Sequence, residues 1–325
     1  MKNCENQIIL FDLIQKETPN MALVDTVSDI LNISNDASYR RIRGETLLSF
    51  EEAIKLCHEF QISIDSFANV NRKNKIQCDY VPLDLNNKAD YFSYIKSISD
   101  IIETVRKAPE SEIILSTVDV TLFNVFLYRE LTSFQLFTWH KSMLGYAADF
   151  ETFVKENDEQ LIALYENIAK NYQLIPSTEI WTENTVDIFL RFLNFHYETG
   201  AFKGEKLPLL LCEQMLDLIN NLHDWAEKGT KGSKEVPFQL YANETDIANT
   251  FVLFKMKEKT NCLIKLFTIN GLNVSDEQFC RETENWLNNS IKRATLISGA
   301  SERERFRFFN AKKQKIRHLI EKIQS

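Results

Sequence analysis

The sequence predicts a mostly α-helical protein with a small antiparallel β-sheet, an α+β fold in two parts. Apolar residues recur at spacings of three and four through the first 70 residues, which is typical of short amphipathic helices. Further along, β-branched runs near 112–118 and within 237–268 interrupt a mainly helical pattern and predict strands. The expected organisation is a five-helix unit at 1–75, a linker at 76–87 and a larger helical and sheet domain at 88–325.

Local signals mark where the N-terminal helices begin and end. Asn32 and Gly44 follow helical patterns, and both residue types tolerate the left-handed conformation that ends a helix. Ser49 precedes a helix by one residue and has Glu52 three positions later, the spacing of a capping box. Residues 69–88 are polar, contain a proline and lack any period, so the linker is expected within this segment, at 76–87.

The elements of the larger domain follow from the same reasoning. An apolar stripe at steps of four and three predicts either a coiled-coil seam or an ordinary buried helix, and its members are Leu211, Met215, Leu218, Leu222 and Trp225. Three strand-like segments follow Pro237, and the last two are separated by a short polar loop that suits a hairpin. Ser275-Asp276-Glu277 is expected to cap the next helix, and a basic helix is expected from about Ser301.

Composition places the protein in the globular class and bounds its surroundings. Of 325 residues, 44% are hydrophobic and 26% are charged. The longest apolar runs stop far short of the ~18–20 residues that a bilayer span requires, and the first residues lack a signal-peptide core. The six cysteines are scattered without a CxxC pair. We therefore expect a soluble, cytoplasmic protein with reduced thiols and no membrane contact.

Charge is distributed unevenly along the chain. The net charge is −8, and residues 81–291 hold 19 basic and 31 acidic side chains, whereas residues 292–325 hold 10 and 3. Within the acidic first 80 residues, Arg40, Arg41 and Arg43 fall in four consecutive positions. A small basic face on an acidic domain is therefore expected.

Residues 22–67 resemble the helix-turn-helix of lambda repressor and Cro-like regulators. The likeness rests on an apolar helix ending at Ile30-Leu31-Asn32-Ile33-Ser34, a following helix from Asn35 to Arg43 closed by Gly44, and a hydrophobic ending at Ile62–Phe67. The resemblance implies that residues 1–75 form a helix-turn-helix domain that binds double-stranded DNA. It also implies that the second helix presents the side chains that read the major groove.

The residues implied for DNA binding lie on that second helix: Asn35, Asp36, Ser38, Tyr39, Arg40, Arg41 and Arg43. Amide and guanidinium groups make bidentate contacts to base edges, so the exposed face is expected to show Asn35, Asp36, Ser38, Tyr39, Arg40 and Arg43. Tyr39 and Arg41 could equally contact phosphates, which position the domain without reading sequence.

The remainder, 88–323, resembles the C-terminal part of a poorly characterised group of bacterial regulators. The likeness rests on Pro176–Trp181, Leu296–Glu302 and Arg305–Phe309. It implies a mixed helical and sheet domain joined to the helix-turn-helix. Because one helix-turn-helix module makes few DNA contacts, this domain is expected to form a homodimer, and an effector, either a small molecule or a peptide, is expected to bind it. The 23 Phe, 10 Tyr and 4 Trp could line a pocket or fill a core.

Motifs of catalysis, metal binding and phosphate binding are missing from the sequence. None of the five histidines belongs to HExxH, and no GxSxG, Walker or GxGxxG pattern occurs. We therefore expect no catalytic residue, no metal, no cofactor and no enzyme activity. The sequence predicts a DNA-binding transcriptional regulator with a C-terminal effector-sensing or dimerisation domain. The alternative is a helical scaffold for a protein or peptide, with the helix-turn-helix as an accessory interaction module.

Overall fold

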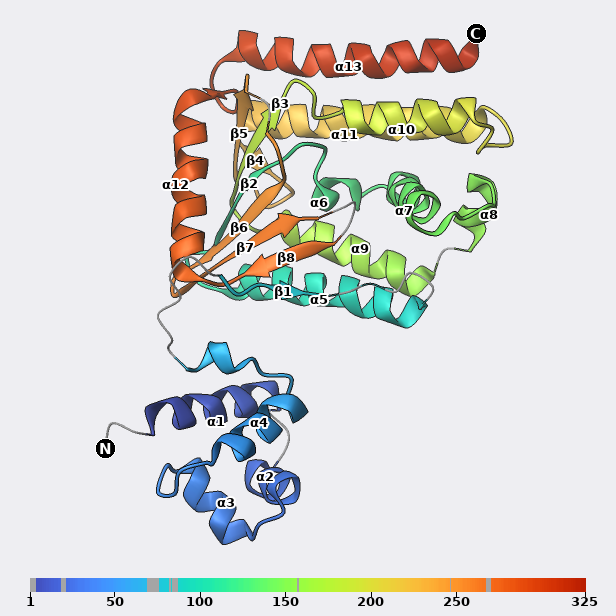
Figure 1. Ribbon diagram of the computed structural model, residues 1–325. Coiled ribbons are helices and arrows are strands. Elements are labelled where there is room, and N and C mark those ends of the chain that lie inside the picture. The colour runs from blue at the N-terminus through green and yellow to red at the C-terminus, as the bar shows by residue number, and fades with distance from the viewer. Residues whose placement is uncertain are drawn as a thin grey trace. The chain divides into compact units, whose positions relative to one another are not determined.

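The computed structural model describes residues 4–18, 22–68, 76–81, 83, 87–156, 158–245, 247–266 and 270–325 (Figure 1). The chain divides into two compact parts, unit 1 (Met1–Lys75) and unit 2 (Ile76–Ser325). Within the described ranges, no helix is both long and apolar enough to cross a membrane.

The described residues of unit 1 form helices around one small core. The helices are α1 (Glu5–Glu17), α2 (Leu23–Leu31), α3 (Asn35–Ile42) and α4 (Phe50–Glu59), and a 3-10 turn, η1 (Ile64–Ser66), takes the place of the fifth. Ser49 and Glu52 form the predicted capping box at the start of α4. The buried core residues are Leu10, Phe11, Ile14, Val27, Leu31, Leu56, Cys57 and Phe67.

A mixed sheet crosses unit 2. Its strands in the described residues are β1 (Asp79–Tyr80), β2 (Glu112–Ser116), β3 (Ser177–Thr182), β4 (Thr230–Lys231), β5 (Val236–Asn243), β6 (Phe251–Met256), β7 (Lys259–Lys265), β8 (Gly271–Val274) and β9 (Thr295–Leu296). Their order is β1-β8-β7-β6-β2-β3-β5-β4, with β9 paired to β5. β3 is parallel to both β2 and β5, whereas the other pairs are antiparallel.

This sheet corrects the small antiparallel sheet that the sequence predicts. β2, β5, β6 and β7 lie where β-branched runs indicate strands, and β6 and β7 form a hairpin. The sequence does not predict β3, because only Ile180 and Trp181 of its six residues are apolar, although the strand occupies an interior position. β1 lies inside the segment expected to be a linker, 76–87, and pairs with β8. The linker prediction is therefore wrong for Asp79 and Tyr80.

Helices cover both faces of the sheet (Figure 1). On one face, α12 (Glu277–Arg293) packs Cys280 and Leu287 against Ile180 and Leu253. On the other lie α5 (Lys88–Lys107), α6 (Leu122–Val125), α7 (Arg129–Leu144), α8 (Phe150–Lys155), α9 (Glu159–Tyr172), α10 (Asp187–Glu198), α11 (Lys206–Lys228) and α13 (Glu302–Gln324). The parallel pairs explain this thick layer, because the chain must cross back over the sheet between β2 and β3 and again before β5.

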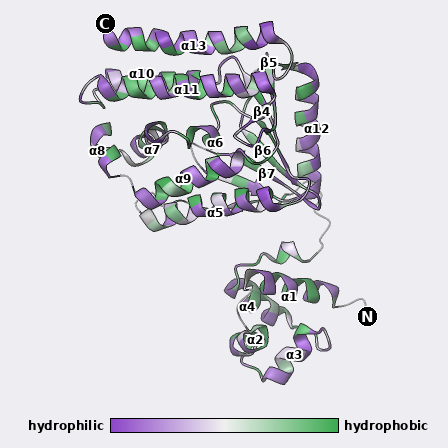
Figure 2. Ribbon diagram, turned by 180° about the vertical axis from the view of Figure 1, so that it is seen from behind, coloured by the Kyte–Doolittle hydropathy of each residue, from purple (hydrophilic) through white to green (hydrophobic). Residues whose placement is uncertain are grey.

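The apolar stripe of α11 belongs to the core of unit 2. Leu211, Met215, Leu218 and Leu222 are buried, and α11 packs along α13 of the same chain. Figure 2 shows hydrophobic and hydrophilic residues alternating along both helices, as amphipathic packing requires. The ordinary buried helix, rather than a coiled-coil seam between chains, accounts for this stripe.

A buried polar network joins β3 to the helical layer. Lys231 donates from Nζ to Ser177 Oγ at 2.6 Å and lies 3.5 Å from the ring centroid of Tyr172. The Tyr172 hydroxyl donates to the Glu179 carboxylate, which also accepts from Trp181 Nε1 at 2.7 Å. Burial lowers the pKa of Lys231 and raises that of Glu179, and each charge partly offsets the effect on the other. The two ionisable groups are therefore tolerated in the core only together.

We predict that Lys231→Met lowers the free energy of unfolding by about 3–5 kcal/mol, because it leaves Glu179 buried without a compensating charge. Lys231→Met combined with Glu179→Gln should recover much of that loss. Urea unfolding followed by tryptophan fluorescence measures unit 2 alone, since all four tryptophans of the chain lie there. A double variant no more stable than Lys231→Met would show that the two groups are not coupled.

Candidate nucleic-acid interface

A tight turn joins α2 to α3. Asn32 adopts the left-handed conformation, with φ 55° and ψ 51°, and its amide donates to the carbonyls of Ser28 and Asp29. Ser34 then caps α3 by accepting a hydrogen bond from the Ala37 amide at 3.3 Å. Ile33 between them is half-buried and packs on the core of unit 1. Asn32 therefore has the left-handed conformation that its place in the sequence predicts.

Ser38 is where α3 meets α2. Its side chain is fully buried, and its hydroxyl donates to the Val24 carbonyl at 2.9 Å. The expectation that Ser38 lies on the exposed face is therefore wrong. Ser38 thus lies directly against the backbone of α2, while the neighbouring Ala37 is half-buried.

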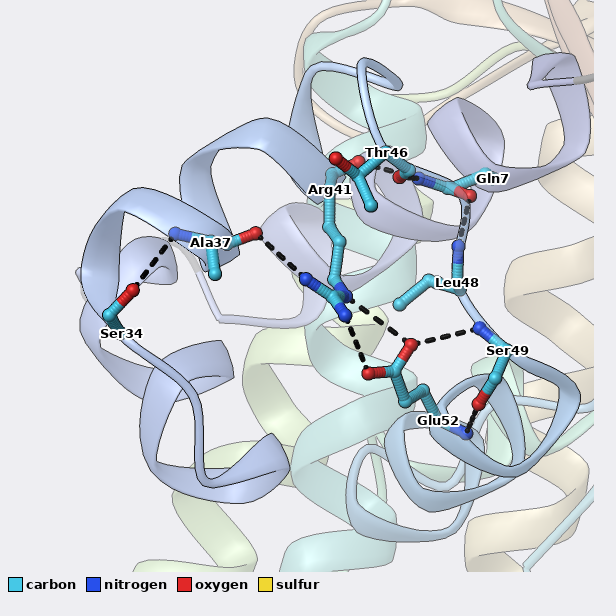
Figure 3. A network of polar contacts seen from close by, with 8 residues as sticks. All are labelled: Gln7, Ser34, Ala37, Arg41, Thr46, Leu48, Ser49 and Glu52. Carbon is cyan, nitrogen blue, oxygen red and sulfur yellow. Dashed lines mark hydrogen bonds and ion pairs between the residues drawn. The ribbon is translucent and has the colours of Figure 1, made fainter.

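Arg41 is bound within unit 1 and does not lie on the outward face (Figure 3). Its guanidinium donates to both carboxylate oxygens of Glu52, at 2.9 and 3.3 Å, and to the Ala37 carbonyl at 3.2 Å. The Arg41 side chain is 17% exposed. The phosphate contact expected of Arg41 would require breaking this bidentate pair, so its position favours a structural role.

Gln7 of α1 fixes the segment that leaves α3 (Figure 3). Its amide nitrogen donates to the carbonyls of Arg41 and Thr46, at 2.6 and 2.9 Å, and its oxygen accepts from the Leu48 amide at 2.9 Å. Gly44 turns the chain with φ +72°, and a Cβ there would lie 3.2 Å from Cys4 Cβ. α3 is thus held by α1, α2 and α4 together.

The remaining predicted residues form the outward face of α3, which we define as Asn35, Asp36, Tyr39, Arg40 and Arg43. Arg40 Nε lies 3.4 Å from Asp36, with side chains 59% and 78% exposed. Arg43 Nε lies 3.6 Å from Glu45, and its guanidinium is 5.4 Å from the Tyr39 ring centroid. Asn35 donates to Asp25 at 2.8 Å. Exposed ion pairs of this kind contribute little, so both guanidinium groups can exchange their partners for another anion.

An exposed apolar patch, which the sequence analysis did not single out, follows α3. It consists of Leu47, Phe50 and Ile54, which are 54%, 73% and 39% exposed. Phe50 is the first residue of α4, directly after the capping Ser49, so the cap fixes the start of the helix while its side chain points away from the core. Phe50 and Ile54 are four residues apart and so share one side of α4, and this spacing is the signal that the sequence offers.

Within the described ranges, no three His, Cys, Asp or Glu side chains gather closely enough to hold a metal ion. Comparison with protein-family models finds no matching family, and comparisons with curated proteins and with solved structures find no similar protein.

We predict that Arg41→Ala loosens α3 and speeds amide exchange there about tenfold, because a hydrogen-bonded charged pair is lost. Burial raises the pKa of Glu52, but the hydrogen bonds from Arg41 and from the Ser49 amide outweigh it and lower that pKa. The stabilisation is thus complete at neutral pH and disappears as the pH falls through the lowered pKa. The difference between variant and wild type should shrink on acidification.

Hydrogen exchange of α3 peptides in the full chain, corrected at each pH for the intrinsic rate, checks this result. Arg40→Ala is the matched control, since Arg40 is exposed, and it should leave the exchange unchanged. Equal exchange in wild type and Arg41→Ala would remove the structural role of Arg41.

Proposed function

We propose that the protein is a DNA-binding transcriptional regulator, in which unit 1 is a helix-turn-helix domain and α3 is its recognition helix. The observation that carries this proposal is the division of α3 into two sides. Ser38 and Arg41 are engaged with α2 and α4, whereas Arg40, Arg43 and Tyr39 point outward with weakly held partners. A helix fixed on one side and offering arginines on the other suits insertion into a major groove.

The chemistry of the outward face suggests a role for each side chain. Arg40 and Arg43 are three residues apart on one face, and each guanidinium can bond guanine O6 and N7 in a bidentate manner. Asn35 can read adenine once it leaves Asp25, and the Tyr39 hydroxyl suits a phosphate. Asp36 disfavours phosphate but stabilises the N-terminus of α3. Ser38 and Arg41 are left out of this set.

The proposed role of unit 2 is dimerisation and effector sensing. One small module makes few DNA contacts, so two copies are needed for useful affinity on paired half-sites. α10 exposes two aromatic side chains one turn apart, Phe192 at 46% and Phe195 at 56%. Such neighbouring apolar side chains are what a homodimer contact would cover.

We expect the full chain to sediment as a dimer at micromolar concentration, and Phe192→Ser combined with Phe195→Ser to be monomeric. Phe306→Ser removes a phenylalanine of α13 that is 61% exposed, and it serves as the control that remains dimeric. A wild-type chain that sediments as a monomer would remove the homodimer from the proposal.

A protein-interaction role is the second candidate, and the apolar patch of Leu47, Phe50 and Ile54 favours it. Three exposed apolar side chains beside α3 are suited to a protein partner and poorly suited to a phosphate backbone. Under this candidate, α3 would provide the charged rim of a protein contact. The DNA-binding candidate predicts that the protein binds a DNA duplex, whereas the protein-interaction candidate predicts that it binds none.

For the DNA-binding role, we predict that Arg40→Ala and Arg43→Ala each weaken binding to a selected duplex. A side chain that reads a base should lose about 1–3 kcal/mol and relax preference at one base pair. A phosphate contact should instead weaken all sequences alike and reduce the salt slope by about one. Fluorescence anisotropy on selected and random duplexes across a salt series separates the two roles.

Arg281→Ala removes an exposed arginine from α12 of unit 2 and is the matched control, expected to bind as wild type does. If the intact protein has no salt-dependent affinity for any duplex in a randomised pool, or if Arg40→Ala with Arg43→Ala binds undiminished, the DNA-binding role fails. The protein-interaction role then takes its place.

A further inference from the structure

A cavity of about 250 Å³ lies in unit 2 between the sheet and α5. Ile98 and Ile101 line it from α5, and Val252, Phe254 and Leu263 line it from β6 and β7. These five side chains come from segments far apart in the sequence and form an apolar wall. Small-molecule sites commonly combine such a wall with a few convergent polar groups.

The register of the sheet shows which polar side chains lie on the cavity side. Successive side chains of a strand point to opposite faces, and in β7 Leu263 lines the cavity whereas Cys262 belongs to the core beneath α12. Leu263 pairs with Asn273 of β8, and Asn273 pairs with Asp79 of β1. Directly paired residues share a face, so Asn273 and Asp79 lie on the cavity side, and both line the cavity.

Asp79 brings a negative charge to the mouth of the cavity. β1 is an edge strand of the sheet, and Asp79 is exposed. Its carboxylate has no hydrogen-bond or ion-pair partner among the residues that the structure describes. Asn273, directly opposite, adds an amide oxygen that can also accept a hydrogen bond. One donor group at this mouth could therefore be bound by both side chains.

The other charges of the lining neutralise each other. Asp119, in the loop after β2, pairs with Lys265 of β7 at 2.9 Å, and their side chains are 18% and 20% exposed. The lining thus holds two carboxylates and one ammonium group, a net charge of −1, and the unpaired charge is that of Asp79. This excess favours a cationic ligand over an anionic one.

We propose that this cavity binds a small amphipathic amine, whose ammonium group pairs with Asp79 and whose hydrocarbon body lies between α5 and the sheet. The ammonium group stays partly in water, because Asp79 is exposed, so the cost of desolvating it is small. A dry apolar cavity of ~150 Å³ holds benzene, so a volume of about 250 Å³ has room for about ten non-hydrogen atoms.

This inference rests on the effector-sensing role proposed for unit 2 and names the chemical class of the effector. Ligand binding is measured on the full chain without DNA, so its outcome is independent of whether α3 binds a duplex. Failure of the amine site and failure of the DNA-binding role are therefore separate results.

The probes are octylammonium, octan-1-ol and octanoate, which share a chain length and differ in the charge of the head group. In isothermal titration calorimetry, octylammonium should bind saturably at one site. It should bind about fivefold more tightly than octan-1-ol, as expected for one exposed ion pair, and octanoate should bind more weakly than the alcohol. Added salt should reduce the preference for the cation.

Two variants locate the site. Asp79→Asn should weaken octylammonium binding about fivefold and leave octan-1-ol binding unchanged, since only the ion pair is lost. Val252→Phe should fill the cavity and abolish the binding of both probes. If Val252→Phe does not fold, Asp79→Asn, which changes an exposed side chain on an edge strand, still decides the result.

Asp90→Asn is the matched control. It removes an exposed carboxylate of α5 that does not line the cavity, and it should leave the affinity for every probe unchanged. Because the whole chain carries a net charge of −8, this control separates the proposed ion pair from a general attraction of cations to an acidic protein.

The proposal is overturned if octylammonium shows no saturable binding, or if octan-1-ol or octanoate binds as tightly as the amine at low salt. It is also overturned if the preference for octylammonium survives in Asp79→Asn, or if Asp90→Asn reduces that preference to the same extent.

Discussion

The burial of β3 is the constraint on which the architecture of unit 2 depends. This strand lies between β2 and β5 and is parallel to both, so the chain crosses the helical face of the sheet before and after it. Glu179 at its centre has no exposure to solvent, and burying a carboxyl there requires partners. Tyr172 at the end of α9 and Trp181 on the same strand supply them. The polar network therefore fixes the helical layer in register with the sheet.

Unit 1 depends on buried polar contacts in the same way, and here they determine what the surface can do. Ser38 on Val24 and Arg41 on Glu52 set the rotation of α3 about its own axis. That rotation leaves Arg40 and Arg43 facing outward, whereas Arg41 faces inward and is bound to Glu52. The side chains proposed to contact DNA, Arg40 and Arg43, are therefore those that make no buried contact within unit 1.

Features determined by neighbours in sequence could be predicted, whereas features determined by distant segments could not. The left-handed Asn32 and the capping box of Ser49 and Glu52 depend on a few consecutive residues. β3, with a central glutamate, becomes a strand only because β2 and β5 flank it. Arg40 and Arg41 are chemically identical, and contacts made by the folded unit, those of Ser38 with Val24 and of Arg41 with Glu52, separate them. The cavity of about 250 Å³ between the sheet and α5 could not be predicted for the same reason. Its walls come from α5, from the loop after β2, and from β6 and β7, which are distant in the sequence.

The central claim is that the outward arginines of α3 contact DNA while Arg41 stays bound to Glu52. The guanidinium Nε–H resonances of Arg40, Arg41 and Arg43, recorded by NMR in the full chain with and without a selected duplex, test it most directly. The account predicts that the signals of Arg40 and Arg43 shift on titration and that the signal of Arg41 does not. Unchanged signals for Arg40 and Arg43 at saturation, or a shift confined to Arg41, would contradict it.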